Sequence, residues 1–302
     1  MPGIVECVPN ISEGRRLDVI DGLAKVIVAT PGVRLLDRTS DPDHNRSVFT
    51  FAGDAEAVES AALSLIDATY KAVDMRGHKG EHPRLGAVDV VPFVPLAGVT
   101  MEECIAIARR VGESVAAKHH VPVFYYAKAA TRPERVRLPD IRKPEYEGLA
   151  EFLETTHVPD AGPRTLNPSA GAIVIGARPP LIAFNIELDT TDLKLAQRIA
   201  KEIRESSGGL PAVQAKGFML SDPPRAQVSM NLLDHTVTTL PQVWREVETR
   251  AAAAGVRILR GELIGLVPLD AALAAAGAAL RLDAFPRDRV IEAHFLERTD
   301  QP

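Results

Sequence analysis

The segment His78-Lys79-Gly80-Glu81-His82-Pro83-Arg84-Leu85-Gly86-Ala87 leads directly into the largely apolar run Val88–Leu96. A run of this kind is typical of a buried β-strand. Gly80 costs about 1 kcal/mol against alanine in a helix interior, and Pro83 disfavours helical backbone at His82. The segment is therefore predicted to be a loop at the mouth of a buried strand, where a rigid scaffold can present reactive side chains.

The loop is dense in ionisable side chains, with five in seven residues: His78, Lys79, Glu81, His82 and Arg84. Imidazoles titrate near neutral pH and can accept and donate protons, and Glu81 can orient one of them. Lys79 and Arg84 can hold an anionic substrate. A solvated polar turn is the plain alternative, but such a turn needs no cluster of this density. We predict a catalytic acid or base here.

The same segment matches the H-x-x-E-H spacing of a family of zinc peptidases, in which both histidines bind metal from one helical face. Gly80 and Pro83 argue against that helix, so no metal is expected. A metallopeptidase holding zinc through His78 and His82 remains a rival interpretation, and elemental analysis would decide it.

Outward from this segment, strand-like and helix-like patterns alternate along the chain. The predicted strands are Ile4–Pro9, Val33–Asp37, Ser47–Gly53, Val88–Leu96, Val121–Ala127, Gly171–Ala177, Leu181–Leu188, Val213–Leu220, Gln227–Leu232, Val256–Leu259 and Leu263–Val267. The predicted helices are Arg16–Ala29, 54–73, Met101–His119, Glu145–Glu154, Thr191–Glu205, Pro241–Ala254 and Asp270–Leu282. Ser12 and Asp54 are expected to cap helices, and Thr100 with Glu103 forms a capping-box pattern.

This order predicts an α+β protein of two α/β subdomains, each a mixed sheet covered by helices, with a ligand cleft between them. A chain of 302 residues has room for two domains of ordinary size. The boundary is expected near Arg178–Pro180, giving residues 1–179 and 180–302. The apolar segments Val91–Leu96 and Gly265–Leu269 both precede helices, which is a weak indication that the halves are related.

The charge and the amino-acid composition of the chain argue against some classes of binding partner. The net charge of −5, the pI near 5.9 and the 5% aromatic content argue against nucleic-acid binding. The N-terminus does not resemble a signal sequence, and no stretch reaches 18 uninterrupted apolar residues. A small-molecule partner and a cytoplasmic location are expected. Cys7 and Cys104 are then expected to be buried free thiols without a catalytic role.

Three further loops contain polar groups that could serve a site. Asp37–Arg46 reads as a polar turn, but Arg46 stands near the start of a strand, where a guanidinium can clamp a carboxylate. Val8–Gly14 joins a strand to a helix, so backbone amides at the helix start could receive an anion. Gly162–Gly171 is either a plain connector or a stiff loop whose polar groups could pair with a heterocycle. No role is assigned to His119, His120, His157, His235 and His294.

Several strings in this order and spacing closely resemble the glutamate formiminotransferase family, over about residues 3–267. They are Val5-Glu6-Cys7-Val8-Pro9-Asn10, Ser12-Glu13-Gly14, Asp74-Met75-Arg76, Gly80-Glu81-His82-Pro83-Arg84, Pro95-Leu96 with Gly98-Val99-Thr100, and Ala183-Phe184-Asn185-Ile186. The chain is similar to the free-standing bacterial form, whereas the mammalian relative is fused to a cyclodeaminase domain.

The resemblance implies transfer of the formimino group of N-formimino-L-glutamate to N5 of tetrahydrofolate, a step of histidine breakdown. Tetrahydrofolate would be the co-substrate, bound between the two subdomains. The implied catalytic residue is His82. The implied folate-binding residues are Gly162, Pro163, Arg164, Thr165, Leu166, Asn167, Pro168, Ser169, Ala170 and Gly171, with Ala170 standing where the mammalian form has tryptophan.

Asn10, Arg46, Glu81 and Arg84 are further candidates. Amides near Asn10, Arg46 and Arg84 would hold substrate carboxylates, and Glu81 or a carbonyl would fix the tautomer of His82. Two alternatives stay open: formyl transfer between glutamate and tetrahydrofolate, and folate capture without catalysis. No nucleic-acid or membrane partner is expected. A homodimer is allowed, but the sequence does not determine the oligomeric state.

Overall fold

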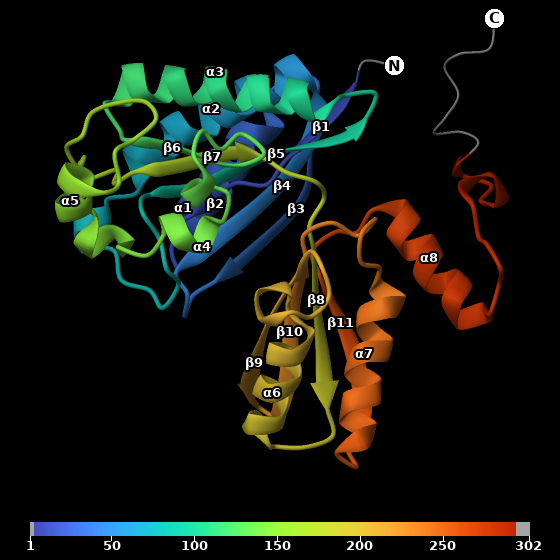
Figure 1. Ribbon diagram of the computed structural model, residues 1–302. Helices are drawn as coiled ribbons and strands as arrows, with labels where there is room; N and C mark the ends of the chain where they lie inside the picture. The colour runs from blue at the N-terminus through green and yellow to red at the C-terminus, as the bar shows by residue number, and fades with distance from the viewer. Residues whose placement is uncertain (1–2, 294–302) are drawn as a thin grey trace, which may run out of the picture. The chain divides into compact units, whose positions relative to one another are not determined.

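The computed structural model describes residues 3–293. The chain divides into two compact units between Arg178 and Pro179 (Figure 1).

A single mixed sheet organises the first unit. Its strands are β1 (Ile4–Cys7), β2 (Asn10–Ile11), β3 (Val33–Asp41), β4 (Arg46–Asp54), β5 (Val88–Ala97), β6 (Val123–Ala127) and β7 (Ile173–Ala177). The predicted strand Ile4–Pro9 ends at Cys7 as β1, and β2 is a separate short strand that follows it. Both strands pair with β4 and β5. The pairs formed among strands β1 to β5 are antiparallel. Strand β7 runs parallel to both β5 and β6. The sheet is therefore mixed, as predicted.

Helices bury both faces of the central strands. They are α1 (Leu17–Val28), α2 (Ala55–Ala72), α3 (Met101–His119), α4 (Leu138–Ile141) and α5 (Glu145–Thr155), with short 3-10 turns at η1 (Met75–Gly77) and η2 (Pro133–Arg135). The main core joins α1, α2 and α3 to one face. A smaller cluster joins α4 and α5 to the other face of β5–β7. Asp54 caps α2, and Thr100 with Glu103 makes the predicted capping box of α3.

The second unit has the order strand, helix, two strands, helix, strand. Its elements are β8 (Ile182–Leu188), α6 (Leu193–Ile203), η3 (Glu205–Ser207), β9 (Val213–Ser221), β10 (Pro224–Leu232), α7 (Leu240–Ala253), β11 (Ile258–Ile264), α8 (Leu269–Leu280) and η4 (Arg287–Arg289). The sheet order is β11-β8-β10-β9, a split β-α-β arrangement.

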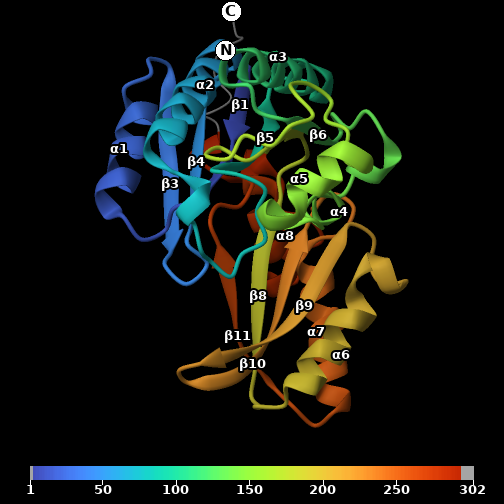
Figure 2. The ribbon, with the colours of Figure 1, turned by 90° about the vertical axis from the view of Figure 1, so that its left-hand side faces the viewer.

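The second sheet differs from the mixed sheet expected, because all three of its pairings are antiparallel. Each helical crossover skips one strand, and the strand that fills the gap runs the other way. Helices α6 and α7 cover one face of this sheet (Figure 2), where the second core forms.

Two further expectations for the C-terminal part were wrong. The strands expected at Val256–Leu259 and Leu263–Val267 are one strand, β11, because Arg260, Gly261 and Glu262 between them also pair with β8. Val91–Leu96 lies inside β5, whereas residues 265–268 form the connection to α8, so the two segments are not structurally equivalent. No helix in the described part of the chain combines the length and the apolar character needed to cross a membrane.

Candidate active site

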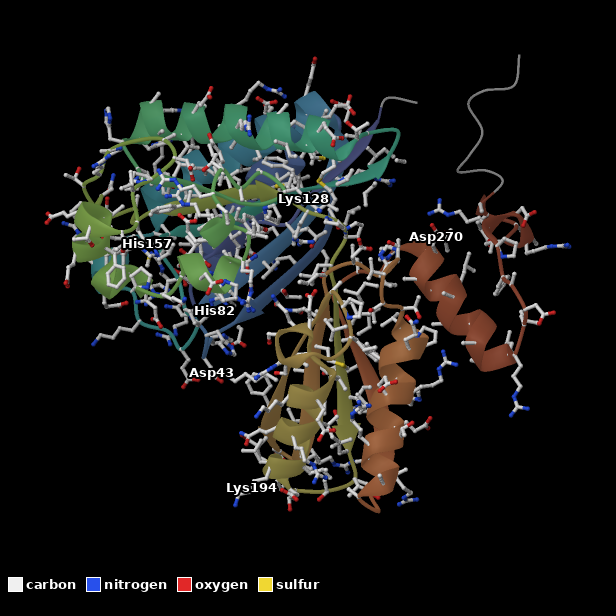
Figure 3. All side chains as sticks on the ribbon, viewed as in Figure 1. Asp43, His82, Lys128, His157, Lys194 and Asp270 are labelled. Atoms are coloured by element: carbon white, nitrogen blue, oxygen red, sulfur yellow. The ribbon has the colours of Figure 1, made fainter. Side chains whose placement is uncertain are left out.

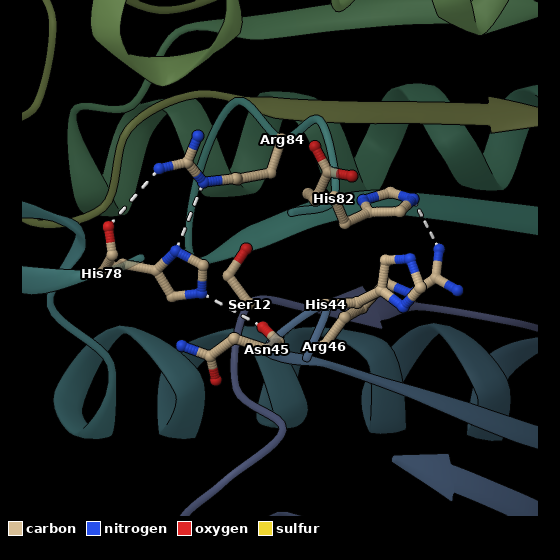
Figure 4. A pocket seen from close by; sticks show the side chains of 8 residues that line it. Ser12, His44, Asn45, Arg46, His78, His82 and Arg84 are labelled. Carbon is tan, nitrogen blue, oxygen red and sulfur yellow. Dashed lines mark hydrogen bonds between the residues drawn. The ribbon is translucent and has the colours of Figure 1, made fainter. Parts of the chain in front are cut away.

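A pocket lies at one end of the first unit's sheet, and we call it the histidine pocket. Side chains from three loops and from the starts of β4 and β5 line it: Ser12, His44, Asn45, Arg46, His78, His82, Arg84 and Asp89 (Figure 4). The segment from His78 to Arg84 is a loop, as predicted, and not a helix. His82 lies beside the β3–β4 turn that carries Asp43 (Figure 3), and Glu81 N donates to Asp43 O across 3.4 Å.

The loop after β2 is anchored to the start of β5. Ser12 N donates to Ala87 O at 2.9 Å, and Ser12 Oγ donates to Gly86 O at 2.7 Å. The expectation that Ser12 caps α1 was therefore wrong, because its hydroxyl is used across the sheet. Glu13 Oε1 instead accepts from the backbone amides of Arg15 and Arg16, each at 2.9 Å.

Asn45 joins the three loops of the pocket. It adopts a left-handed backbone with φ of 47°, a conformation that asparagine tolerates better than most residues. Its Oδ1 accepts from Gly14 N at 2.9 Å, and its Nδ2 donates to Lys79 O at 3.0 Å. A side chain at Gly80 would come within 2.3 Å of His44 O, so this approach requires glycine. The sequence reasoning assigned Asn45 no role in the site, although an asparagine in a polar turn was a usable signal.

These hydrogen bonds argue against the anion site that was expected at the start of α1. The backbone amides from Ser12 to Arg16 already have acceptors within the chain. Asn10 lies in β2, and its side-chain amide donates to Val8 O at 3.3 Å. It does not line the histidine pocket, where Ser12 is the contribution of this loop.

His82 is held as a neutral imidazole. Arg46, the first residue of β4, donates from Nη1 to His82 Nε2 at 2.6 Å. The ring also hydrogen-bonds the backbone of Pro83, which has only a carbonyl to offer, so Nδ1 carries the proton. Burial, with the charges of Arg46, Arg142 and His44, lowers the pKa of His82 to about 3.

Glu81 does not orient His82. Its side chain is exposed, and within residues 3–293 its carboxylate has no hydrogen-bond partner. The other expectation was that a carbonyl fixes the tautomer of His82, and the backbone of Pro83 is the group that hydrogen-bonds the ring.

His78 is oriented by a buried arginine. Arg84 is 5% exposed, and its Nε donates to His78 Nδ1 at 3.2 Å. His78 Nε2 then donates to Asn45 O at 3.1 Å. Burial is the main cause that lowers the pKa of His78. The guanidinium of Arg84 also binds both oxygens of Glu147, so it is already paired and is poorly placed to hold a substrate carboxylate.

A further ion pair, between Arg142 and Asp89, acts electrostatically on His82, and the sequence reasoning missed it. Arg142, just after α4, pairs with Asp89 at the start of β5, and Asp89 also accepts from Leu85 N at 2.9 Å. Arg142 contributes to the low pKa of both His82 and Arg46. Its partner is 53 positions away, so no local pattern could reveal the pair.

An adjoining hollow of about 330 Å³ shares Ser12, Asn45 and His78 with the histidine pocket. Its other walls are Glu13, Arg15, Arg16, Ala72, Val73, Asp74 and Gly77. This volume is in the range of small-molecule sites. The two spaces thus meet at His78 and Asn45.

The segment Gly162–Gly171 packs against the loop that carries His82. Ala87 N donates to Ala170 O at 2.9 Å, and Met75 N donates to Ser169 O at 2.9 Å. Asn167 shapes the turn, because its Oδ1 accepts from the backbone amides of Ser169 and Ala170. Neither the histidine pocket nor the adjoining hollow is lined by this segment.

The remaining candidates have structural roles or no assigned role. Burial raises the pKa of Cys7 well above its usual value and that of Cys104 to about 12, which disfavours a thiolate at either position. Among residues 3–293, no group of three or more His, Cys, Asp or Glu side chains could hold a metal ion. His294 lies outside the described residues.

Sequence comparisons show the family to which the chain belongs. Residues 4–178 match the family described as "Formiminotransferase domain, N-terminal subdomain", and residues 183–284 match "Formiminotransferase domain". The chain is 43% identical to a glutamate formimidoyltransferase of Streptococcus pyogenes, with 98% of this chain and 100% of the relative covered. It is 41% identical to one of Thermoplasma acidophilum, with 96% of each covered. It is 47% identical to the formimidoyltransferase-cyclodeaminase of Rattus norvegicus over 91% of this chain and 52% of the relative, about half of that longer protein.

The fold, the histidine pocket and these relatives define a transferase of one-carbon groups. The chain belongs to the formiminotransferase family.

Proposed function

We propose that this protein transfers the formimino group from N-formimino-L-glutamate to N5 of tetrahydrofolate, giving 5-formiminotetrahydrofolate and glutamate, in histidine degradation in the cytoplasm. The observation that carries the proposal is a neutral, half-buried His82 beside cationic groups, in a chain 43% identical to a glutamate formimidoyltransferase over nearly its full length.

The reaction needs one group that can first accept and then donate a proton. N5 of tetrahydrofolate attacks the formimino carbon, and a tetrahedral intermediate forms. The proton on N5 passes to His82 and then to the glutamate nitrogen, whose bond to the formimino carbon breaks. A neutral imidazole suits this sequence, because it accepts the first proton and releases it in the second step.

The donor carboxylates and the folate have separate candidate positions. Arg46 is half-buried and has no carboxylate partner among the described residues, which makes it the best candidate for holding a donor carboxylate. We keep Asn10, Glu81 and Arg84 as weaker candidates for substrate contact, because Asn10 and Arg84 already hydrogen-bond within the chain and Glu81 is exposed.

We propose that the segment from Gly162 to Gly171 contacts tetrahydrofolate. Its support is proximity, because the hydrogen bond from Ala87 to Ala170 ties the segment to the strand that follows the His82 loop. N5 has to reach His82, so a folate contact next to this loop is required in any productive arrangement. No metal has a part in the proposed reaction, and elemental analysis of the purified protein tests that point.

A single-turnover assay tests the proposal. Enzyme in excess is mixed with tetrahydrofolate and N-formimino-L-glutamate, or with N-formyl-L-glutamate, and glutamate release is followed. Faster release from the formimino donor supports the proposal. Faster release from the formyl donor would favour formyl transfer, and folate binding without release from either donor would reduce the protein to a binding module.

A further inference from the structure

The proton-accepting nitrogen of His82 is occupied in this structure. Arg46 Nη1 donates to Nε2 at 2.6 Å, and the ring's other nitrogen faces the Pro83 backbone. A base needs a free lone pair, so His82 cannot accept a proton from N5 while this contact lasts. The lining side chains also meet so closely that no water-sized space remains in the histidine pocket. The site as it stands is closed to catalysis.

The groups around His82 show why Arg46 is the one free to move. Asp89 and Arg142 pair with each other. Arg84 is bound to Glu147 and to His78. His44 Nδ1 bonds Asp41 at 2.5 Å in the β3–β4 turn, with its ring centroid 6.1 Å from that of His82. Arg46 alone faces His82 without a carboxylate partner among the described residues.

Its surroundings favour an incoming anion. Burial lowers the pKa of Arg46, with a further contribution from the charge of Arg142, and the charges of Asp89 and Asp41 offset this only in part. A half-buried cation beside a second cation is stabilised when a carboxylate binds, and a guanidinium prefers a two-pronged carboxylate partner to a single ring nitrogen.

We propose that Arg46 is a latch that the α-carboxylate of the donor releases: the guanidinium leaves His82 Nε2, pairs with that carboxylate, and frees the imidazole to act as the base. The inference rests on the proposed function. The α-carboxylate is assigned because it sits on the carbon that bears the formimino nitrogen, so it is close to His82 whenever the reacting group is.

The latch adds a specificity mechanism to substrate binding. A donor without this carboxylate leaves His82 hydrogen-bonded to Arg46 and therefore unreactive. When the guanidinium of Arg46 leaves His82 and pairs with the carboxylate, its positive charge no longer opposes protonation of the imidazole. The pKa of His82 therefore rises only when a donor is bound.

Titration of His82 by NMR tests the latch without any turnover. Ring-labelled histidine is introduced, and His82→Gln identifies the resonance. In the free enzyme His82 should titrate well below its ordinary range, and saturating L-glutamate should raise the midpoint by about one pH unit or more. In Arg46→Met the midpoint should be raised without glutamate and should not move further when glutamate is added. Arg38→Met, on the neighbouring strand and paired with Asp21, is the matched control and should behave like the wild type.

Donor analogues give an independent readout. N-formimino-L-glutamine keeps the α-carboxylate, whereas N-formimino-L-isoglutamine has an α-amide. We compare each amide with N-formimino-L-glutamate as donor. We expect kcat to fall on the order of a hundredfold for the α-amide donor and by less than about tenfold for the γ-amide donor. If bound glutamate leaves the His82 titration unchanged, or if both amides react alike, the latch is refuted while the proposed function stands. If N-formimino-L-glutamate is not a donor at all, the proposed function fails and the latch with it.

Discussion

Arg84 and Glu147, 63 positions apart, form a two-pronged ion pair at the edge of the histidine pocket, with Nη2–Oε1 at 2.6 Å and Nη1–Oε2 at 2.8 Å. The arginine side chain is 6% exposed and the glutamate side chain 62% exposed. The pair anchors a buried cation whose Nε–H in turn bonds His78. Helix α5 thereby supports the loop that carries His82.

Glu147→Gln should destabilise the protein by about 1–2 kcal/mol, because it leaves a buried guanidinium without its main charged partner. Urea unfolding at neutral pH measures the effect. Glu145→Gln is the control, since that carboxylate lies 3.5 Å from Arg84 and is a weaker partner. Equal stability of the two variants would show that the ion pair does not anchor Arg84.

His82→Ala should lower formimino transfer on the order of a hundredfold or more, because the base and acid are lost together. Tetrahydrofolate binding, measured by fluorescence titration, should stay close to that of the wild type. His120→Asn, at an exposed left-handed position at the end of α3, serves as the control and should keep full activity. Turnover by His82→Ala within a few-fold of the wild type would rule out the catalytic assignment.

Stability should depend on pH through His82. Its folded pKa of about 3 lies below the ordinary value of about 6.5 for the unfolded chain. Between these values the unfolded chain binds more protons, so stability should fall as the pH drops below about 6.5. The wild type should therefore lose more stability than His82→Gln between about pH 7.5 and 5, as measured by urea unfolding. Parallel losses in the two proteins would mean that His82 is not buried in its neutral form.

Gly171→Ala should disrupt the segment that we propose for folate. Gly171 has φ of +74°, and an added Cβ would lie 2.3 Å from Leu85 O, next to the His82 loop. Gly208→Ala is the matched control, because Gly208 has φ of +85° with no atom near its Cβ position. The control should lose only the about 1–2 kcal/mol of a left-handed alanine, whereas Gly171→Ala should lose more and bind tetrahydrofolate weakly. Equal unfolding midpoints, or unimpaired folate binding by Gly171→Ala, would contradict this role.

Local patterns in the chain were enough to predict most of the helices and strands. The helical spacing of apolar residues and the capping residues predicted α2 and α3. Asp54 and the Thr100–Glu103 pair accept hydrogen bonds from amides at the helix ends, and these contacts lie within three residues. Gly80 and Pro83 likewise decided that the His78–Arg84 segment is a loop, since their backbone limits are local. These predictions succeeded because each rests on interactions between neighbours in the chain.

The pairing of the strands and the contacts between distant side chains could not be predicted in this way, because they arise when the chain folds. The antiparallel second sheet depends on which strand fills the gap left by each helical crossover, and no strand's own sequence records its neighbour. The contact of Arg46 with His82 spans 36 positions, and that of Arg142 with Asp89 spans 53. The low pKa of His82 follows from burial and from these distant cations, so the chemical state of the proposed base is a property of the folded chain.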